Sequence, residues 1–424
     1  DEFKKRCTAK LEVASSGTFF HSNHARLLPS FDRGATATGD ELTLRVKLGE
    51  GAFCEVKEII AITLKRKPNP EDGISNGDGK EINSTKGRDE SETDEADFPV
   101  DIFQTKSEIR DYMAENFIRE EGGKNARYAL KQLKPTNSQK HVEQGLIDIS
   151  IEARFLACLN HPNVIKMRGI AGDPLSPEFG LVLDRLYLTL EDKMDLWTER
   201  KNAASSKLCG CLFESVDKKE KSSLAFEAIT VAYDLACALR YIHGNNLVYR
   251  DIKPENAGFD VRGDIKLFDF GFCKELSKNL HDKPSGLYKL TRMTGSPPYL
   301  SPENFLGKPY GKSTDVFSFG VLLWEMLHQK FAFYQYNRQD YKDVVVERNY
   351  RPPIDKSFSA RIKELIKESW DPEPKSRPTF NRISLLLKAL YQELLNDADD
   401  DKSGTRSQRN IDASVRSFRA RNKK

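Results

Sequence analysis

The chain has 424 residues, of which 38% are hydrophobic and 31% are charged, and its formal net charge is +3. This length provides the core of roughly two to three domain units, and a charge so close to neutral gives no overall case for nucleic-acid binding, which favours a strongly basic domain. Because no apolar run reaches the ~20 residues that span a bilayer and the seven cysteines are irregularly spaced, we expect an intracellular protein, cytoplasmic or nuclear, without a transmembrane segment or a disulfide framework.

A glycine-rich loop follows an N-terminal extension that covers residues 1–40. The chain begins with Asp, so we expect that an upstream segment is missing and that targeting information has gone with it. Residues 48–56 read LGEGAFCEV, in which Gly49 and Gly51 allow the backbone to close over phosphate groups. Glycine pairs often mark only a tight turn, so the meaning of this loop depends on the motifs that follow it.

A polar insert occupies residues 65–125. Its first part, about 66–97, is rich in Gly, Asn, Asp and Glu and almost without aromatic residues, so we expect it to be disordered. Thr105 and Glu108 then form a capping-box pattern, which predicts a helix over about 106–120. We expect its apolar face to pack on a neighbouring sheet, and a docking site for a regulator is the alternative use of that face. The apolar face consists of Ile109, Tyr112, Met113 and Phe117.

A lysine in a strand pattern and a glutamate in a helix pattern come after the insert. Lys131 lies in the β-like run RYALKQL, two residues after Ala129. Glu152 lies in a segment whose apolar residues recur every three to four positions and which ends at Asn-His-Pro. Either side chain alone would normally be a solvated surface charge, so their interpretation also depends on the rest of the pattern.

The strongest chemical signal is the run Tyr249 to Asn256, YRDIKPEN, together with Asp269 in FDFG. Phosphoryl transfer needs little covalent help, so a catalyst must position the attacking hydroxyl, accept or orient its proton and neutralise phosphate oxygens. Asp251 can accept the proton, and Lys253 can stabilise the transferred phosphate. Asn256 and Asp269 offer hard oxygen ligands that suit Mg²⁺. This spacing therefore predicts phosphoryl-transfer chemistry.

Taken in order, these motifs resemble the eukaryotic protein kinases, whose catalytic loop is H-R-D-x-x-x-x-N and whose metal-binding acid lies in D-F-G. The resemblance implies that Lys131 binds the α and β phosphates of ATP and pairs with Glu152 when the enzyme is switched on. Leu183 resembles the gatekeeper, and the hinge would follow it. The implied catalytic residues are Asp251, Lys253, Lys131 and Glu152; the implied Mg²⁺ ligands are Asn256 and Asp269; and the implied ATP contacts are Leu48, Gly49, Gly51, Phe53, Val56, Ala129, Lys131, Asp184 and Leu186.

Three positions depart from the family pattern. Cys54 stands where the loop's third glycine is expected, so the turn must accommodate a side chain there. Tyr249 replaces the histidine of the usual catalytic loop, and the resemblance implies that its ring stacks with Phe270 and with Leu156 of the helix. Ser301 stands where the A-P-E motif has alanine.

The segment from Gly271 to Glu303 is expected to be the activation segment. Within it, Ser296 resembles the residue that contacts Asp251 and Lys253 in serine/threonine kinases, so serine and threonine are the predicted acceptors. Arg250 resembles the arginine that binds a phosphorylated activation segment, and a structural arginine satisfied by backbone carbonyls is the alternative. The candidate phosphosites are Ser285, Thr291 and Thr294.

The carboxyl-terminal half supplies the frame of the predicted enzyme. Ser313 is expected to cap the apolar helix that follows it. Asp315 resembles the buried acid that hydrogen-bonds the catalytic-loop backbone, and Arg377 resembles the residue that pairs with Glu303. The run WDPEPKSRPTF, with the patterns HPN and FSFGVLLWEM, places the chain closest to the tyrosine-kinase-like group of serine/threonine kinases.

The implied fold class is α+β and bilobal, with a small β-rich N-lobe that carries the regulatory helix and a large, mainly α-helical C-lobe. We expect the N-lobe over residues 41–183 and the C-lobe over 184–396. A polar surface loop is expected over about 200–223, and a disordered, acidic-then-basic tail over 397–424.

The predicted function is the transfer of the γ-phosphate of Mg-ATP to serine and threonine hydroxyls of protein substrates. A pseudokinase that binds nucleotide and acts as a scaffold is the alternative, although Lys131, Asp251 and Asp269 are all present. Protein substrates are the expected partners, with activation by an upstream kinase or by autophosphorylation, and no specific nucleic acid is expected to bind.

Overall fold

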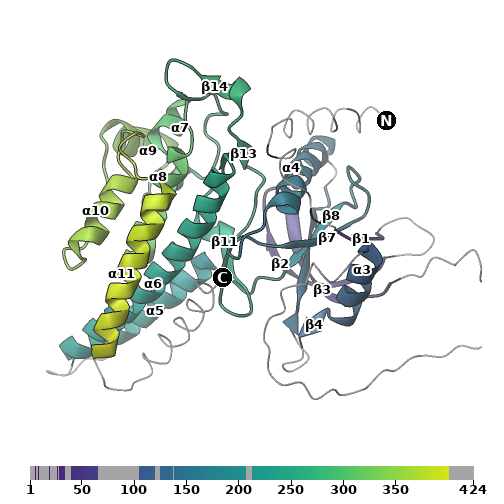
Figure 1. Ribbon diagram of the computed structural model, residues 1–424, viewed down its shortest axis with the longest axis horizontal. Helices are drawn as coiled ribbons and strands as arrows, with labels where there is room; N and C mark the ends of the chain where they lie inside the picture. Colours follow the sequence, from purple (N-terminus) through teal and green to yellow (C-terminus); the bar gives the residue numbers. More distant parts are fainter. Residues whose placement is uncertain are drawn as a thin grey trace, which may run out of the picture. The chain divides into compact units, whose positions relative to one another are not determined.

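The computed structural model describes residues 28–33, 40–64, 105–119, 125–136, 138–206 and 213–400, together with positions 5, 8, 19 and 26. The chain forms two compact units (Figure 1). The sheet unit comprises Leu27–Lys134 and Arg168–Val182, and the helical unit comprises Asp1–Arg26, Pro135–Met167 and Leu183–Lys424. A β-sheet unit and a mainly helical unit are the two lobes that the family resemblance implied.

The sheet unit is built on six strands in the order β1, β7, β8, β6, β3, β2. Neighbouring strands β2, β3 and β6 are antiparallel, whereas β1 runs parallel to β7. The strand β1 lies within the expected N-terminal extension, and its Phe31 is fully buried, so core packing joins this part of the extension to the sheet. The strands are β1 (Ser30–Phe31), β2 (Leu42–Glu50), β3 (Cys54–Ile62), β6 (Tyr128–Leu133), β7 (Met167–Ala171) and β8 (Gly180–Asp184).

Helix α3 (Lys106–Glu115) packs on this sheet, and its predicted capping box is present. The Thr105 hydroxyl accepts the Glu108 N–H at 3.2 Å, and the Glu108 carboxylate accepts the Thr105 N–H at 2.8 Å. The helix ends earlier than the predicted residue 120 because Asn116 forms its C-cap and the chain then enters a short hairpin of β4 (Ile118–Arg119) and β5 (Asn125–Ala126). Two residues of the helix, Ile109 and Met113, are buried in the core of the sheet unit. The other buried residues of this core are Phe31, Leu42, Ile59, Ile62, Tyr128, Leu130, Ala171 and Val182.

The residues predicted to be disordered, about 66–97, lie outside the described part of the chain, so that prediction stays a prediction. The same holds for the tail from residue 401 onwards, which includes its basic part. The acidic residues just before it continue a helix, because α11 (Phe380–Asp400) extends past the predicted C-lobe boundary at 396.

Long helices form the helical unit. Helix α4 (Gln139–Cys158) carries Glu152 and groups with this unit, although the predicted N-lobe included it; the backbone N–H of Asn160, just after the helix, donates to the Tyr241 hydroxyl at 3.0 Å. Helices α5 (Leu190–Ser206), α6 (Phe213–Gly244) and α11 run side by side (Figure 1). The other helices are α7 (Pro302–Leu306), α8 (Ser313–His328), α9 (Arg338–Tyr341) and α10 (Ala360–Ser369), with a π-helical turn, η4, at Lys342–Glu347.

The predicted surface loop over about 200–223 is wrong for the residues described on both sides of it. Helix α5 continues to Ser206 and α6 begins at Phe213, while residues 207–212 lie outside the described part. Arg200 of α5 pairs with Glu220 at 2.7 Å and with Glu227 at 2.6 Å, both on α6. The lysine-rich composition that suggested a loop is also compatible with helix, and these ion pairs join the two helices.

The predicted cap of α8 is also wrong. Ser313 is the first helical residue, and Lys312 occupies the N-cap position without a side-chain hydrogen bond. The first turn is closed by backbone bonds instead, from Thr314 N–H to the Gly311 oxygen at 3.1 Å and from Asp315 N–H to the Lys312 oxygen at 3.2 Å.

One stretch of α6, Glu220–Gly244, is long and apolar enough to cross a membrane by length and composition. In the helical unit 78% of its most apolar window is buried among neighbouring elements. Its apolar character is therefore that of a core helix.

Short strands hold the loops next to the expected catalytic residues. Three form a sheet in the order β12, β11, β9, and two further pairs are β10 with β13 and β14 with β15. Because β11 follows the YRDIKPEN loop directly and β12 precedes FDFG, their antiparallel pairing brings both motifs to one end of this small sheet. The strands are β9 (Leu188–Thr189), β10 (Leu247–Val248), β11 (Ala257–Phe259), β12 (Ile265–Leu267), β13 (Lys274–Glu275), β14 (His281–Asp282) and β15 (Leu287–Tyr288).

Candidate active site

The buried carboxylate of Asp315 holds the start of the catalytic loop. It accepts the backbone N–H groups of Tyr249 and Arg250, each at 2.8 Å, and it contacts His243 Nε2 at 2.8 Å. Arg250 has a left-handed backbone with φ of 74°, which is costly for a residue with a side chain. The two hydrogen bonds offset that cost, as the resemblance implied for Asp315.

Asp251 lies at the centre of a hydrogen-bonded cluster. Its Oδ1 accepts the N–H and the hydroxyl of Ser296, each at 3.0 Å. Its Oδ2 accepts from Asn256 Nδ2 at 2.7 Å and lies 3.1 Å from Lys253 Nζ. Lys253 also donates to the Ser296 hydroxyl at 2.9 Å. Asp251, the predicted proton acceptor, therefore contacts both Lys253, the predicted phosphate-stabilising lysine, and Ser296 of the activation segment.

Asp269 enters the same region through β12. The backbone N–H of Phe268 donates to the backbone oxygen of Asn256 at 3.0 Å, which joins the FDFG motif to the catalytic loop. Asp269 has a left-handed backbone with φ of 60°. Burial raises the pKa of Tyr249 well above its usual value, and the carboxylates of Asp269, Asp251 and Glu152 raise it further. All three predicted acids of the helical unit therefore lie within electrostatic range of one buried ring.

The part of the predicted stack that joins Tyr249 to Phe270 is present, whereas the part that involves Leu156 stays a prediction. Its ring meets Phe270 at 5.3 Å between centroids with an interplanar angle of 72°, an edge-to-face geometry. Tyr249 also donates its hydroxyl to the Phe268 backbone oxygen, a bond that histidine in its place could not make in the same way. Leu156 is likewise fully buried in the helical unit.

Three of the predicted nucleotide contacts in the sheet unit lie in one row across three neighbouring strands. Gly49 lies opposite Val56, and Val56 lies opposite Lys131, so these positions fall on one line across β2, β3 and β6. Neither Gly49 nor Gly51 has a positive φ, and a Cβ at Gly49 would meet no protein atom. Gly49 is therefore not crowded by the described residues around it.

The remaining loop residues are held by backbone bonds. Cys54 begins β3, and its carbonyl accepts the Gly51 N–H at 2.8 Å, so the turn closes without the third glycine. The Phe53 oxygen accepts the Lys134 N–H at 2.9 Å. Leu48 lies in β2, and Ala129 is buried in β6.

The predicted hinge residues belong to the helical unit. Leu183 is buried, and Asp184 N–H donates to the Lys166 oxygen at 3.1 Å. A Cβ at Gly258 would lie 2.9 Å from Leu186, so glycine at that position allows Leu186 to approach β11 closely. Leu186 therefore lies next to the strand that follows Asn256.

Arg250 is satisfied by protein groups in this structure. Its Nε donates to the Phe272 oxygen at 2.7 Å, and its Nη1 donates to the Tyr310 hydroxyl at 3.3 Å. Tyr310 in turn donates to the Thr291 oxygen at 2.6 Å. Tyr310 was missed in the sequence because it lies outside every recognised motif, and only the fold brings it between the other two residues.

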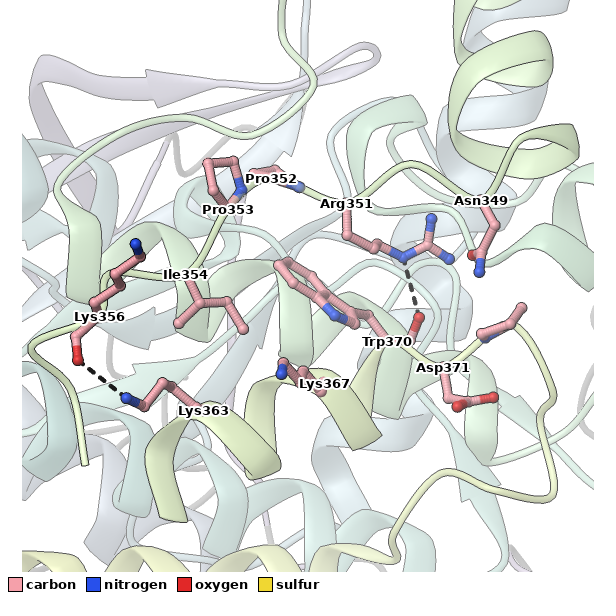
Figure 2. Close-up of a pocket in the computed structure, with 11 residues that line it drawn as sticks. Asn349, Arg351, Pro352, Pro353, Ile354, Lys356, Lys363, Lys367, Trp370 and Asp371 are labelled. Carbon is pink, nitrogen blue, oxygen red and sulfur yellow. Dashed lines mark hydrogen bonds between the residues drawn. The ribbon is translucent and has the colours of Figure 1, made fainter. Parts of the chain in front are cut away.

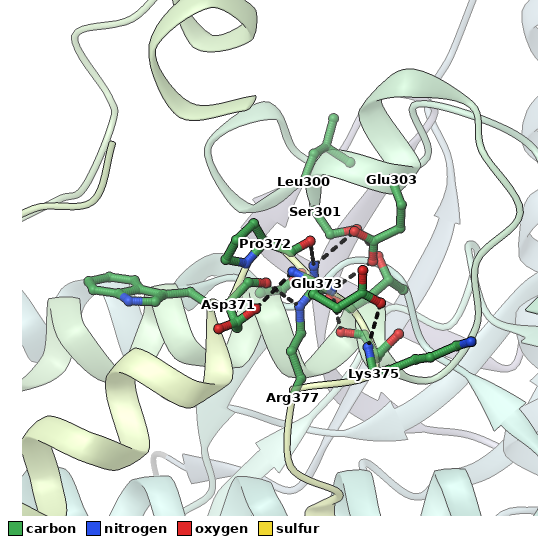
Figure 3. Close-up of polar contacts among 12 residues, drawn as sticks. Leu300, Ser301, Glu303, Asp371, Pro372, Glu373, Lys375 and Arg377 are labelled. Carbon is green, nitrogen blue, oxygen red and sulfur yellow. Dashed lines mark hydrogen bonds and ion pairs between the residues drawn. The ribbon is translucent and has the colours of Figure 1, made fainter. Parts of the chain in front are cut away.

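The end of the activation segment is joined to the helical core by Arg377. Its two terminal nitrogens reach the Glu303 carboxylate at 2.7 and 2.9 Å, as the resemblance implied. Figure 3 shows the same guanidinium close to the backbone of Asp371 and Pro372, and its Nε donates to the Asp371 oxygen at 2.7 Å. Ser301, in place of alanine, is buried and shares a hydrogen bond with Thr314 at 2.7 Å.

A groove of about 600 Å³ lies elsewhere in the helical unit, beside α10 (Figure 2). Four basic side chains line it, and none of the predicted site residues does. The stretch 349–373 carries five basic and five acidic residues, the acidic ones at 355, 364, 368, 371 and 373, so its formal charges balance and we assign the groove no ligand. The basic lining residues are Arg351, Lys356, Lys363 and Lys367.

Comparisons with known proteins find sequence similarity to protein kinases. Dual specificity protein kinase shkB of Dictyostelium discoideum is 36% identical over 177 residues, which cover 40% of this chain and 26% of the relative. Dual specificity protein kinase shkD of the same organism is 26% identical over 257 residues (59% and 30%), and serine/threonine-protein kinase STY17 of Arabidopsis thaliana is 26% identical over 277 residues (65% and 43%). The chain thus spans less than half the length of each of these relatives.

A family model described as protein kinase domain matches residues 117–388, which is more than half of the 424 residues. The match begins after the glycine-rich loop and includes Lys131, Glu152, the catalytic loop, Asp269 and Arg377. The relatives named as serine/threonine kinases are consistent with a tyrosine-kinase-like placement. The chain belongs to the protein kinase domain family.

Proposed function

We propose that this chain is an active protein kinase that transfers the γ-phosphate of ATP to a serine or threonine hydroxyl of a protein substrate. The observation that carries the proposal is the contact of one carboxylate, that of Asp251, with Lys253, Asn256 and Ser296. A scaffold without catalysis would have no need for this arrangement of ionised groups, because partly buried charges are costly unless their pairing is used.

In the proposed reaction the substrate hydroxyl oxygen attacks the γ-phosphorus, the bond to the bridging oxygen breaks and ADP leaves. Asp251 accepts the proton of the attacking hydroxyl. Lys253, 3.1 Å from Asp251, contributes positive charge beside the transferred group. Lys131 would bind the α and β phosphates and would be oriented by Glu152.

The residues present fit a magnesium ion. The side-chain N–H of Asn256 donates to Asp251 Oδ2 at 2.7 Å, which leaves the amide oxygen of Asn256 for a cation, and Asp269 would add a carboxylate. Mg²⁺ takes hard oxygen ligands and fills its other positions with water and phosphate. When bound, the ion would neutralise charge on the phosphate oxygens.

Serine and threonine acceptors are favoured because Lys253 contacts Ser296, as the resemblance implies for serine/threonine kinases. The relatives shkB and shkD are named dual specificity protein kinases. A tyrosine peptide therefore belongs in the test of acceptor preference.

The test compares the unmodified chain with Asp251→Asn, and with Asp195→Asn as a control at an exposed carboxylate on α5. We expect labelled phosphate to reach serine and threonine peptides with the unmodified chain and the control. Asp251→Asn should lower the transfer rate by roughly 10²-fold or more while nucleotide binding, measured by calorimetry, is retained. Transfer by Asp251→Asn at the unmodified rate would refute the role of this residue.

A further inference from the structure

The C-terminal end of α4 is held by a segment that lies more than a hundred residues earlier in the chain. The backbone N–H of Arg26 donates to the Ala157 oxygen at 2.9 Å, and Nη2 of Arg26 donates to the Leu156 oxygen at 2.5 Å. The last four carbonyl groups of a helix have no partner within that helix. Arg26 therefore satisfies two of the carbonyls that α4 leaves open.

The charge of Arg26 also suits this position. Helix α4 has no basic residue in its own last turn, and a cation near a helix C-terminus is stabilising because it faces the negative end of the helix dipole. Burial raises the pKa of the Cys158 thiol, and the charge of Arg26 opposes that rise. Arg26 thus supplies the C-terminal charge that the helix sequence itself does not provide.

A second contact comes from Phe19. Its side chain is 4% exposed, and its ring centroid lies 5.9 Å from that of Phe155. The N-terminal residues 19 and 26 therefore contact three consecutive positions in the last turn of α4, namely 155, 156 and 157.

This last turn is the one next to Glu152. Positions 152 and 156 are four residues apart and lie on the same helix face, and both side chains are almost fully buried. Beyond the helix, His161 stacks on Tyr241 of α6 at 5.3 Å. The end of α4 thus has one contact with the core helix α6 and others with Arg26 and Phe19, within two turns of Glu152.

We propose that Arg26 is a positioning residue for phosphoryl transfer: by capping α4 it holds the turn that follows Glu152, and with it the orientation of this buried carboxylate. The inference rests on the proposed kinase function. Arg26 contacts no reacting atom in this scheme, and it acts only through α4.

The kinetic test uses Arg26→Ala, Arg26→Lys and a control, Arg348→Ala, which removes an exposed arginine of the helical unit. A small displacement of a positioned group is costly for catalysis, so we expect kcat/KM for ATP to fall about tenfold in Arg26→Ala. Arg26→Lys should recover part of the loss because it retains the charge, and Arg348→Ala should match the unmodified chain. Unchanged kcat/KM in Arg26→Ala would overturn the proposal.

A double-mutant cycle separates positioning from general destabilisation. In a Glu152→Gln background, Arg26→Ala should cause no further loss, because residues that act through one another are not additive. The fraction folded is measured by circular dichroism in every variant. An equal loss in both backgrounds, or a loss that only follows the unfolded fraction, would show that Arg26 is merely structural.

Hydrogen exchange tests the cap independently of activity. Arg26→Ala, and Phe19→Leu as a second variant, should speed amide exchange at residues 155–160 and leave α8 unchanged. If the unmodified chain transfers no phosphate, the proposed function fails, and faster exchange would still confirm the cap. Unchanged exchange at residues 155–160 would overturn it in either case.

Discussion

Arg377 and Glu303 form a two-point ion pair inside the helical unit, and their side chains are 0% and 6% exposed. Arg377 also donates to the backbone oxygen of Ser313 at 2.9 Å and to that of Asp371 at 2.7 Å. One guanidinium therefore joins the start of α7, the start of α8 and the segment that follows α10. The end of the activation segment depends on this residue for its place.

Removal of Arg377 should be strongly destabilising. Arg377→Ala leaves the Glu303 carboxylate buried without a cation, which typically costs about 3–5 kcal/mol in the free energy of unfolding. Urea denaturation measures this loss. The control is Arg382→Ala, whose arginine is 56% exposed in its pair with Glu368 and whose loss should be below about 1 kcal/mol. Equal losses in the two variants would contradict the role given to the buried pair.

The hydroxyl of Ser296 should matter for turnover more than for nucleotide binding. It bridges Asp251 and Lys253 at 3.0 and 2.9 Å, so Ser296→Ala loosens both residues. We expect kcat to fall by about tenfold, with the dissociation constant for ATP within twofold of the unmodified value. Ser296→Thr retains the hydroxyl and should keep most of the activity. If the alanine and threonine variants have the same kcat, the hydroxyl between Asp251 and Lys253 does not contribute to catalysis.

The catalytic cluster could be predicted from sequence because its members are close in sequence and the chemistry limits the residue types. Asp251, Lys253 and Asn256 lie within six positions, and the short pairing of β11 with β12 returns the chain to Asp269. The capping box at Thr105 is equally local, so its hydrogen bonds were predictable, although the end of α3 was not. Local patterns specify helix starts better than helix ends, because the end depends on where the next element pairs.

Contacts between distant segments could not be predicted where the residues belong to no recognised motif. Nothing in residues 28–33 indicated that Phe31 would be buried in a sixth strand beside β7. Arg26 at the end of α4 and Tyr310 beside Arg250 belong to no motif. The polar stretch around Arg200 was predicted as a loop because composition does not reveal that its charges are paired between two helices. Each of these features depends on which surfaces meet after folding.

Thr291 is the better of the two neighbouring threonines as a phosphosite. Its side chain is exposed, whereas Thr294 is 9% exposed and donates its hydroxyl to the Thr291 oxygen at 2.9 Å. We expect mass spectrometry of the active enzyme to find phosphate on Thr291. Thr291→Ala should lower the transfer rate, and Thr294→Ala should chiefly lower stability, by about 1 kcal/mol, through loss of a buried hydrogen bond.

The double variant Thr291→Ala, Thr294→Ala tests whether Arg250 binds a phosphate group on the activation segment. Arg250 now bonds the Phe272 oxygen and the Tyr310 hydroxyl, and a phosphate on the segment would compete for its guanidinium. If the idea holds, the double variant loses the activation that phosphorylation brings. Unchanged turnover would leave Arg250 as a structural arginine.

His161 should make the folded protein sensitive to acid. Its ring is stacked on Tyr241, and its Nδ1 accepts the Asn163 N–H at 3.1 Å, so the neutral imidazole is the form that fits. Burial lowers the pKa of His161 to about 4 from 6.5, with the charges of Arg240 and Lys266 contributing in the same direction. Because the unfolded state binds the proton more tightly, stability is present above pH 6.5 and is lost as the pH falls towards 4.

The measurement is urea unfolding at pH 7.5 and at pH 4.5 for the unmodified chain and for His161→Asn. Asparagine retains an acceptor for the Asn163 N–H and does not titrate. We expect the unmodified chain to lose on the order of 2–3 kcal/mol more than His161→Asn between the two values. His281→Asn, at an exposed histidine, is the matched control and should lose as much as the unmodified chain. If His161→Asn shows the same pH dependence as that control, the acid sensitivity arises from other groups.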